Sequence, residues 1–234
     1  MLDIKNIDVL YDDFQVIWNV SLNVNKSEMV ALLGPNGSGK STILNTISNL
    51  VNHKKGEIYF QNKLITEIPT YKRTMLGISH VLERRRVFPH LTVMQNLLLG
   101  AWHPKAKESL NKSLSKIYKI FPKLETRSNQ LAHTMSGGEQ QMLAVARGLM
   151  GLPKLLMVDE PFLGLSPIVV KDLITIFKNI VSEGISILFI EQNVRLALSM
   201  ADRGYVLESG RLVINGKSED LIDNEEVKKV FLGN

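Results

Sequence analysis

Residues 34–41 read Gly-Pro-Asn-Gly-Ser-Gly-Lys-Ser, and this segment constrains the fold more than any other part of the chain. It fits the pattern G-x-x-x-x-G-K-[ST]. The residues before it, Met29 to Leu33, form a continuous apolar run, which is typical of a strand buried on both faces of a parallel sheet. The residues after it, from Ser41 to about Leu50, favour a helix. A strand, a glycine-rich turn and a helix in this order predict an α/β fold with a mostly parallel sheet.

The same segment has the chemistry that a phosphate group needs. Glycines let backbone N–H groups converge on phosphate oxygens, and the N-terminus of the following helix adds a positive dipole. A lysine neutralises the β- and γ-phosphate oxygens, and a serine hydroxyl ligates Mg²⁺. An exposed glycine-rich turn is the alternative, but the flanking strand and helix argue against it. We therefore predict a nucleotide-binding loop made of Gly34, Pro35, Asn36, Gly37, Ser38, Gly39, Lys40, Ser41 and Thr42.

An acidic pair completes such a site. Asp159 and Glu160 directly follow the apolar run from Leu155 to Val158, which also reads as a buried strand. At the end of a neighbouring strand, Asp159 would hold Mg²⁺ through water, and Glu160 would orient or deprotonate an attacking water molecule. A pair of acids that only caps the next helix is the alternative reading.

The remaining segments are distinguished by the spacing of their apolar residues. Alternation from Leu2 to Val24 predicts antiparallel sheet. Helical spacing in a lysine-rich middle, from about Phe88 to Gly151, predicts an inserted helical subdomain. Shorter patterns predict a strand–helix–strand crossover and, later, a strand hairpin followed by a last helix; they cover residues 155–158, 169–181, 185–190, 205–207, 211–214 and 225–231.

Composition argues against several other classes of protein. The chain has 28 Lys and Arg against 23 Asp and Glu, a mild basic excess, so no nucleic-acid partner is expected. It has no cysteine and therefore neither a disulfide framework nor a thiolate metal site. Its five histidines lack paired ligand spacing, so Mg²⁺ is the one metal we expect. We see no signal-peptide pattern and no apolar run near the roughly 18 residues of a membrane span, so any membrane role should be peripheral.

The order of four motifs adds a resemblance. These are GPNGSGKST, MSGGEQQ, LLMVDEP and LGLSP, at residues 34–42, 135–141, 155–161 and 163–167. In this order the whole chain resembles the nucleotide-binding domain of an ATP-binding cassette (ABC) protein, and the SGGEQQ signature is the specific part. The resemblance implies one ABC ATPase domain over residues 1–234, with a P-loop NTPase (RecA-like) core. Residues 1–87 and 152–234 would form this core and an N-terminal antiparallel β subdomain, and residues 88–151 a helical signature subdomain.

The resemblance also implies a mechanism. Two cassettes would enclose two ATP molecules head to tail, so Ser136, Gly137 and Gly138 would contact the nucleotide bound by the partner's loop. Tyr11 matches the aromatic residue on which adenine stacks; Phe14 is nearby, and a strand aromatic that packs in the core is the alternative.

Three positions depart from the family pattern. Glu83 stands where the family normally has a glutamine that reaches Mg²⁺, and a carboxylate can still ligate that ion. Gln192 replaces a histidine that contacts the γ-phosphate, so it can donate a hydrogen bond but carries no charge. Phe162 replaces a small polar residue. A nucleotide-binding regulatory subunit with an inactive site is therefore an alternative to an ATPase.

Further segments narrow the resemblance to one branch. Residues 83–93, 96–101, 191–193 and 201–210 are similar to the smaller ATPase of branched-chain amino-acid importers. This implies a second ABC ATPase, identical or different, two integral membrane permease subunits and, indirectly, a solute-binding protein, all at the cytoplasmic face of the membrane. ATPases of urea, amide or other amino-acid importers are the alternatives. Arg84 to Arg86 would belong to a docking surface for the permease, with a solvated turn or a nucleic-acid patch as the other readings.

Overall fold

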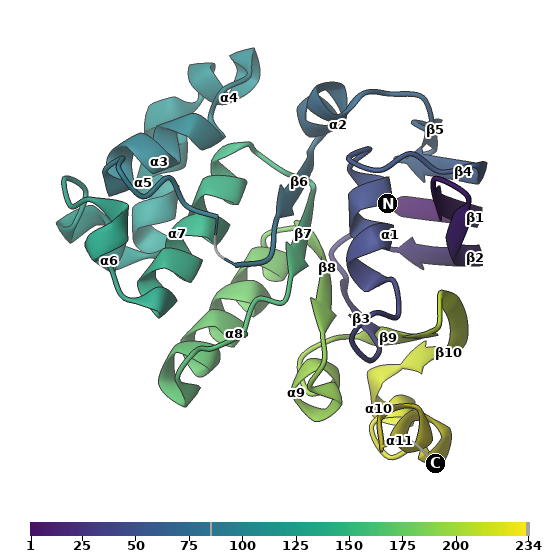
Figure 1. The fold of residues 1–234 in the computed structure, drawn as a ribbon. Coiled ribbons are helices and arrows are strands. Elements are labelled where there is room, and N and C mark those ends of the chain that lie inside the picture. The colour runs from purple at the N-terminus through teal and green to yellow at the C-terminus, as the bar shows by residue number, and fades with distance from the viewer. Residues whose placement is uncertain (85, 233–234) are drawn as a thin grey trace.

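The computed structural model describes residues 1–84 and 86–232, and within them the chain is an α/β structure with two sheets (Figure 1). One sheet has four strands in the order β2-β1-β4-β5 and the other has six in the order β10-β9-β3-β8-β7-β6. In the six-stranded sheet every neighbouring pair is parallel except β10 with β9. The predicted fold class is confirmed.

The four-stranded sheet contains the predicted antiparallel strands. β1 (Leu2–Tyr11) pairs with β2 (Phe14–Val24), and most of their alternating apolar side chains are buried, although Val16 and Trp18 are only half-buried. The sequence analysis missed the other two strands, β4 (Lys55–Phe60) and β5 (Lys63–Leu64). β4 carries only two deeply buried side chains, Ile58 and Phe60, and this alternation is too short to distinguish a strand from a loop.

The six-stranded sheet forms the core of the molecule. β3 (Met29–Leu33), β7 (Leu155–Asp159) and β8 (Ser186–Glu191) have every residue buried, as their continuous apolar runs predicted. β6 (Ile78–Val81) lies at one edge, and β9 (Arg203–Glu208) and β10 (Arg211–Lys217) lie at the other. Because β3, β7 and β8 are parallel, their carboxyl ends meet at one edge of the sheet.

Helices cover both faces of this sheet. α1 (Lys40–Ile47) packs its apolar side chains between the two sheets. It ends three residues earlier than predicted, with Ser48 as its C-cap. α8 (Pro167–Ser182) packs on the other face and joins β7 to β8, which confirms the predicted crossover. Gly184, at φ 94°, ends that connection.

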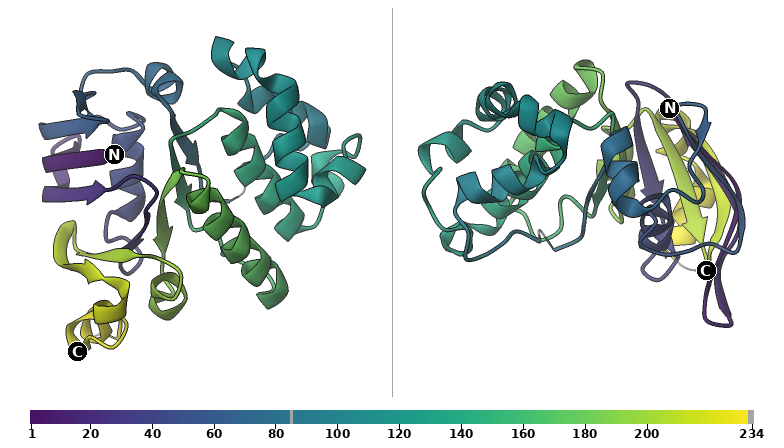
Figure 2. Two further views of the ribbon diagram at one scale, coloured as in Figure 1. Left: turned by 180° about the vertical axis from the view of Figure 1, so that it is seen from behind. Right: turned by 90° about the horizontal axis from the view of Figure 1, so that it is seen from above.

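The middle of the chain gives several short helices, which lie at the opposite end of the molecule from the four-stranded sheet in both views of Figure 2. They are α3 (Val93–Gly100), α4 (Pro104–Glu108), α5 (Leu110–Ile120), α6 (Pro122–Thr126), a 3₁₀ turn (Ala132–Thr134) and α7 (Gly137–Met150). The other helices are α2 (Thr70–Leu76), α9 (Val194–Leu198), α10 (Ser218–Leu221) and α11 (Glu225–Leu232). Across the described ranges no helix combines the length and the apolar character that crossing a membrane requires.

Candidate active site

The loop between β3 and α1 has the backbone that its glycines allow. Gly34 and Gly39 have φ angles of 155° and 102°. A Cβ atom at Gly34 would lie 2.2 Å from the backbone oxygen of Leu207, and one at Gly39 would lie 2.5 Å from the side chain of Ile17. Gly39 is also the N-cap of α1 and, without a side chain, leaves the N-terminus of that helix open to a ligand.

Lys40 lies folded inside this loop. Its Nζ donates hydrogen bonds of 2.9 Å to the backbone oxygens of both Gly34 and Pro35, and the residue is only 5% exposed. Burial lowers the pKa of Lys40, while the carboxylates of Glu160 and Asp159 act in the opposite direction. The ammonium group is therefore held where it can exchange two carbonyl oxygens for phosphate oxygens.

Asp159 ends β7 beneath the loop. Burial raises its pKa to about 6, the hydrogen bond from Ser41 lowers it, and the nearby carboxylates of Glu160 and Glu83 raise it further. Its Oδ1 is buried without a hydrogen-bond partner in the described part of the chain. A buried, unpartnered carboxylate oxygen next to a serine hydroxyl fits a bound Mg²⁺ or a water molecule of its hydration shell.

The described residues contain no group of three or more histidine or carboxylate side chains that would form a metal site by itself. A magnesium ion at Asp159, Ser41 and Glu83 would thus need nucleotide phosphates and water to complete its coordination, which is the usual arrangement for this ion.

Glu160 and Gln192 meet although 32 residues separate them. Gln192 follows β8, and its Nε2 donates a hydrogen bond to Oε1 of Glu160. Glu160 itself has φ 46°, in the left-handed region that residues other than glycine seldom adopt. The backbone bend after β7 and the amide of Gln192 thus fix the Glu160 carboxylate together.

These groups surround one cavity of about 460 Å³. The loop contributes Asn36, Gly37 and Gly39 to Thr42, and the facing wall contains Glu83, Glu160, Leu163 and Gln192. The structure therefore brings the loop, Glu83, Glu160 and Gln192 together. Gly34 and Pro35 line the inner side of the loop around Lys40, and Ser38 is buried in it.

Tyr11 and the signature residues do not line this cavity. Tyr11 pairs with Phe14 where β1 and β2 meet, and both side chains are exposed. Val16 is the residue of this hairpin that lines the cavity, so adenine stacking on Tyr11 stays a prediction.

Ser136 is the N-cap of α7 and forms a reciprocal capping box with Glu139. Gly138 is required by packing, because a Cβ atom there would lie 2.9 Å from a methyl group of Val169 on α8. Gly137 lies between them, in the first turn of α7. α7 lies on the other side of β6 and β7 from α1 (Figure 1). Ser136 is exposed and Gly138 is buried, and contact of the signature residues with a second cassette's nucleotide stays a prediction.

Two residues near the site have positions that the sequence analysis did not predict. Phe162 is buried, and its ring lies 6.0 Å from that of Phe177 and 6.5 Å from that of Phe189, so it fills the core instead of a polar position at the phosphate. Glu191 was not predicted as a site residue, yet it is buried at the end of β8, close enough to Lys40 to raise the pKa of that lysine. A signal was present in the sequence: Glu191 directly follows a buried apolar run, as Asp159 does.

A family profile described as "ABC transporter" matches residues 17–163, more than half of the chain. The chain belongs to the ABC transporter ATP-binding family. It is 40% identical over 233 residues to the high-affinity branched-chain amino acid transport ATP-binding protein BraG of Pseudomonas aeruginosa, with 100% of both chains covered. It is 35% identical to the probable branched-chain amino acid transport ATP-binding protein LivF of Archaeoglobus fulgidus, over 100% of this chain and 99% of that relative.

Another relative in the family is named for a different transport system. The lipopolysaccharide export system ATP-binding protein LptB of Haemophilus influenzae is 32% identical, over 100% of this chain and 97% of its own. Among solved structures, a nucleotide-free ATP-binding cassette from an ABC transporter has a TM-score of 0.89 at 28% identity and covers 100% of this chain and 99% of its own. A dimeric cassette bound to ADP and phosphate has a TM-score of 0.81 at 26% identity and covers 93% of this chain and 99% of its own.

The family and the geometry agree on the general activity. The chain is an ABC ATPase subunit that binds nucleotide, and ATPases of this family work as dimers coupled to membrane permease subunits.

Proposed function

We propose that this chain is the ATP-hydrolysing subunit of an importer for branched-chain amino acids. The observation that carries the proposal is the 40% identity to BraG over the full length of both chains, and the similarity to LivF supports it. The similarity to LptB favours a second candidate, the ATPase of an exporter of amphiphilic molecules. Urea and amide importers, and a regulatory subunit without turnover, are further alternatives.

In this proposal ATP binds with its phosphates in the loop of residues 34–42 and its adenine near Tyr11. Ser41 and Glu83 would hold Mg²⁺ directly and Asp159 through water, and the ion would neutralise charge on the β- and γ-phosphate oxygens. Glu160 orients or deprotonates the attacking water. The side-chain amide of Gln192, which donates to Oε1 of Glu160, holds this carboxylate in place.

The second N–H of the Gln192 amide donates a hydrogen bond to a γ-phosphate oxygen. This side chain carries no positive charge and stabilises the developing phosphate charge less than a protonated histidine does. Ser136, Gly137 and Gly138 contact the nucleotide of a second cassette, which is either a copy of this chain or a related chain. The dimeric solved cassette supports this arrangement.

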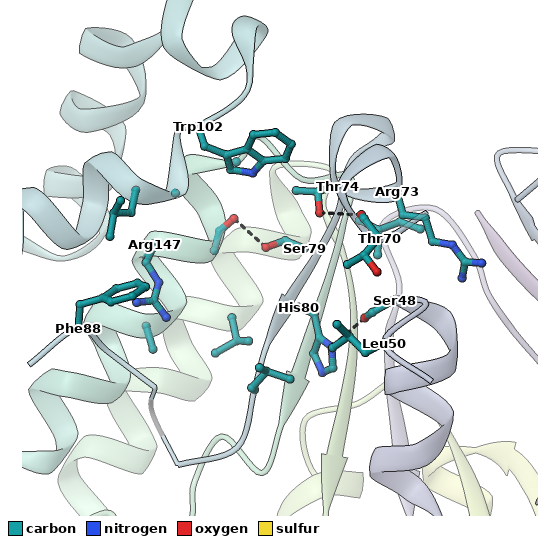
Figure 3. Close-up of a pocket in the computed structure, with 18 residues that line it drawn as sticks. Ser48, Leu50, Thr70, Arg73, Thr74, Ser79, His80, Phe88, Trp102 and Arg147 are labelled. Carbon is teal, nitrogen blue, oxygen red and sulfur yellow. Dashed lines mark hydrogen bonds between the residues drawn. The ribbon is translucent and has the colours of Figure 1, made fainter. Parts of the chain in front are cut away.

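We further propose that residues 88–151 act as the helical subdomain and the rest of the chain as the core. A groove of about 440 Å³ lies between the two parts (Figure 3). Its walls include the exposed apolar side chains of Leu50, Phe88 and Trp102, and Leu99 contributes another. An apolar groove with charged edges fits a short amphipathic helix of a permease subunit.

One residue of the arginine segment, Arg86, is joined to a wall of this groove by Arg147. The guanidinium group of Arg147 lies 5.1 Å from the centre of the Phe88 ring and donates a 2.6 Å hydrogen bond to the backbone oxygen of Arg86. Arg84 is exposed and pairs with Glu83 at 3.4 Å, whereas Arg85 lies outside the described residues. Arg147 thus lines the groove and connects it to the backbone of Arg86.

Two adjacent residues connect the groove to the nucleotide cavity. Leu82 lines the groove and Glu83 lines the cavity. A displacement of this segment by the permease therefore moves a side chain at the Mg²⁺ position, which supports coupling of docking to hydrolysis. Binding to a permease would place the chain at the cytoplasmic face of the membrane, with a solute-binding protein acting through the permease from the other side.

The test is ATP turnover of the chain with its permease subunits and second ATPase in lipid vesicles, with Glu160→Gln as the inactive control. Stimulation by a binding protein loaded with leucine, isoleucine or valine supports the proposal. Stimulation by urea, amides or an amphiphile assigns a different transporter, and ATP binding without turnover under any condition assigns a regulatory subunit.

A further inference from the structure

Glu191 is a buried carboxylate at the end of β8, next to the cavity residue Gln192. In the sheet register it lies opposite Leu33, the last residue before the phosphate-binding loop, and its neighbour Ile190 lies opposite Asp159. The residue is 7% exposed. A carboxylate at such a position needs hydrogen-bond donors to compensate for lost hydration.

A donor comes from the chain directly after Glu191. The backbone N–H of Gln192 donates a 2.9 Å hydrogen bond to Oε2 of Glu191. Asn193 in turn caps α9, since its Oδ1 accepts a 3.0 Å hydrogen bond from the N–H of Leu196. The Glu191 side chain therefore fixes the bend that leads from β8 to α9, and Gln192 is the middle residue of that bend.

This bend decides where the Gln192 amide lies. A glutamine side chain has three rotatable bonds, so its amide can be held at one place only if the backbone is fixed and the amide has a partner. The partner of the amide is Oε1 of Glu160. The backbone at Gln192 is held by the hydrogen bond from its N–H to the Glu191 carboxylate. Glu160 is likewise held by an unusual backbone conformation, at φ 46°.

We propose that Glu191 is a positioning residue for ATP hydrolysis, which sets the Gln192 amide against Glu160 by accepting the backbone N–H of Gln192. The inference rests on the roles given to Glu160 and Gln192 under the proposed function, but not on the identity of the transported solute. Hydrogen-bond acceptance by Glu191 is the property that matters, so a glutamine at this position should replace it and an apolar residue should not.

The first test measures position directly. The Gln192 side-chain amide is observed by ¹⁵N–¹H NMR in the full nucleotide-free chain and assigned by its absence in Gln192→Leu. We expect Glu191→Leu to move this signal to the region of exposed glutamine amides and Glu191→Gln to leave it near its original position. Ile187→Val, a conservative change at the other end of β8, is the matched control and should not move the signal.

The second test measures the effect of the same variants on ATP turnover. In the assembled ATPase we expect Glu191→Leu to lower kcat by about 10- to 100-fold, because misplacement by about 1 Å costs up to that factor, with KM for ATP within twofold. Glu191→Gln should restore most of the lost turnover. The proposal is overturned if Glu191→Leu leaves the Gln192 signal in place, or if Glu191→Gln loses as much turnover as Glu191→Leu.

The two proposals fail separately. A transporter that hydrolyses ATP without response to any branched-chain amino acid contradicts the solute assignment but leaves the NMR comparison and the Leu–Gln contrast at residue 191 valid.

Discussion

Replacement of Asp159 by asparagine should stabilise the nucleotide-free protein while it abolishes hydrolysis. Burial raises the pKa of Asp159 from 3.8 to about 6. The folded chain therefore holds this proton more tightly than the unfolded chain does, and the free energy of unfolding falls as the pH rises between these two values. Asparagine keeps the shape and can still accept the hydrogen bond from Ser41, but it never ionises.

The difference between 3.8 and about 6 corresponds to about 3 kcal/mol, since each pKa unit is worth about 1.4 kcal/mol. We expect Asp159→Asn to raise the free energy of unfolding by about 3 kcal/mol at pH 8. At pH 5 the gain should be about half as large, because much of the wild-type Asp159 is already protonated there in the folded state.

Urea unfolding of wild type and Asp159→Asn at pH 5 and pH 8, without nucleotide, measures the difference between their free energies of unfolding. Asp13→Asn, at an exposed position, is the matched control and should stay within about 0.5 kcal/mol of wild type at both pH values. Addition of magnesium and ATP should stabilise the wild type more than Asp159→Asn. A variant that is less stable than wild type at pH 8, or a gap that is equal at both pH values, would refute the reasoning.

Three further predictions concern single side chains. Arg73 is fully buried and donates hydrogen bonds of 2.6–3.0 Å to the backbone oxygens of residues 46, 47, 66 and 68. Arg73→Met leaves these oxygens unpaired and should lower the free energy of unfolding, measured in urea, by about 3–5 kcal/mol. A loss below about 1 kcal/mol contradicts this role. Glu160→Gln should keep ATP affinity, lower turnover by about 10²- to 10⁴-fold and accumulate an ATP-bound dimer in size-exclusion chromatography; unchanged turnover removes Glu160 from the mechanism. Trp102→Ala should abolish stimulation of ATP turnover by the permease and leave unstimulated turnover intact. Leu64→Ala, at an exposed position on β5, is the control and should change neither stimulated nor unstimulated turnover. Equal stimulation of both variants contradicts docking at the groove.

Long apolar runs and sequence-local motifs were predicted well. β3, β7 and β8 lie where continuous apolar residues placed them, and the loop after β3 follows from glycines that a side chain would obstruct. Short or interrupted patterns were predicted poorly. The β4–β5 pair was missed, and the helical middle is divided into several helices by caps such as Thr92 and His103 that the spacing of apolar residues does not reveal.

α1 ends early because Asn49 takes the left-handed conformation, at φ 59°, and the N–H of Leu50 bonds back to the backbone oxygen of Asn45. The last carbonyl groups of the helix, at Thr46 and Ile47, accept hydrogen bonds from Arg73, which comes from α2 and lies buried among them. Nothing in the sequence near Leu50 indicates this partner, because the contact joins segments 26 residues apart.

The sequence by itself determined the family, the phosphate-binding loop, the acidic strand end and the signature segment. Each of these is encoded in contiguous residues, whose backbone geometry depends on local sterics and hydrogen bonding. Only the tertiary structure decided that Gln192 lies against Glu160, that Glu83 faces the same cavity and that Phe162 fills the core. These contacts depend on the order of strands in the sheet, which brings the ends of β7 and β8 together although a helix separates them in the chain.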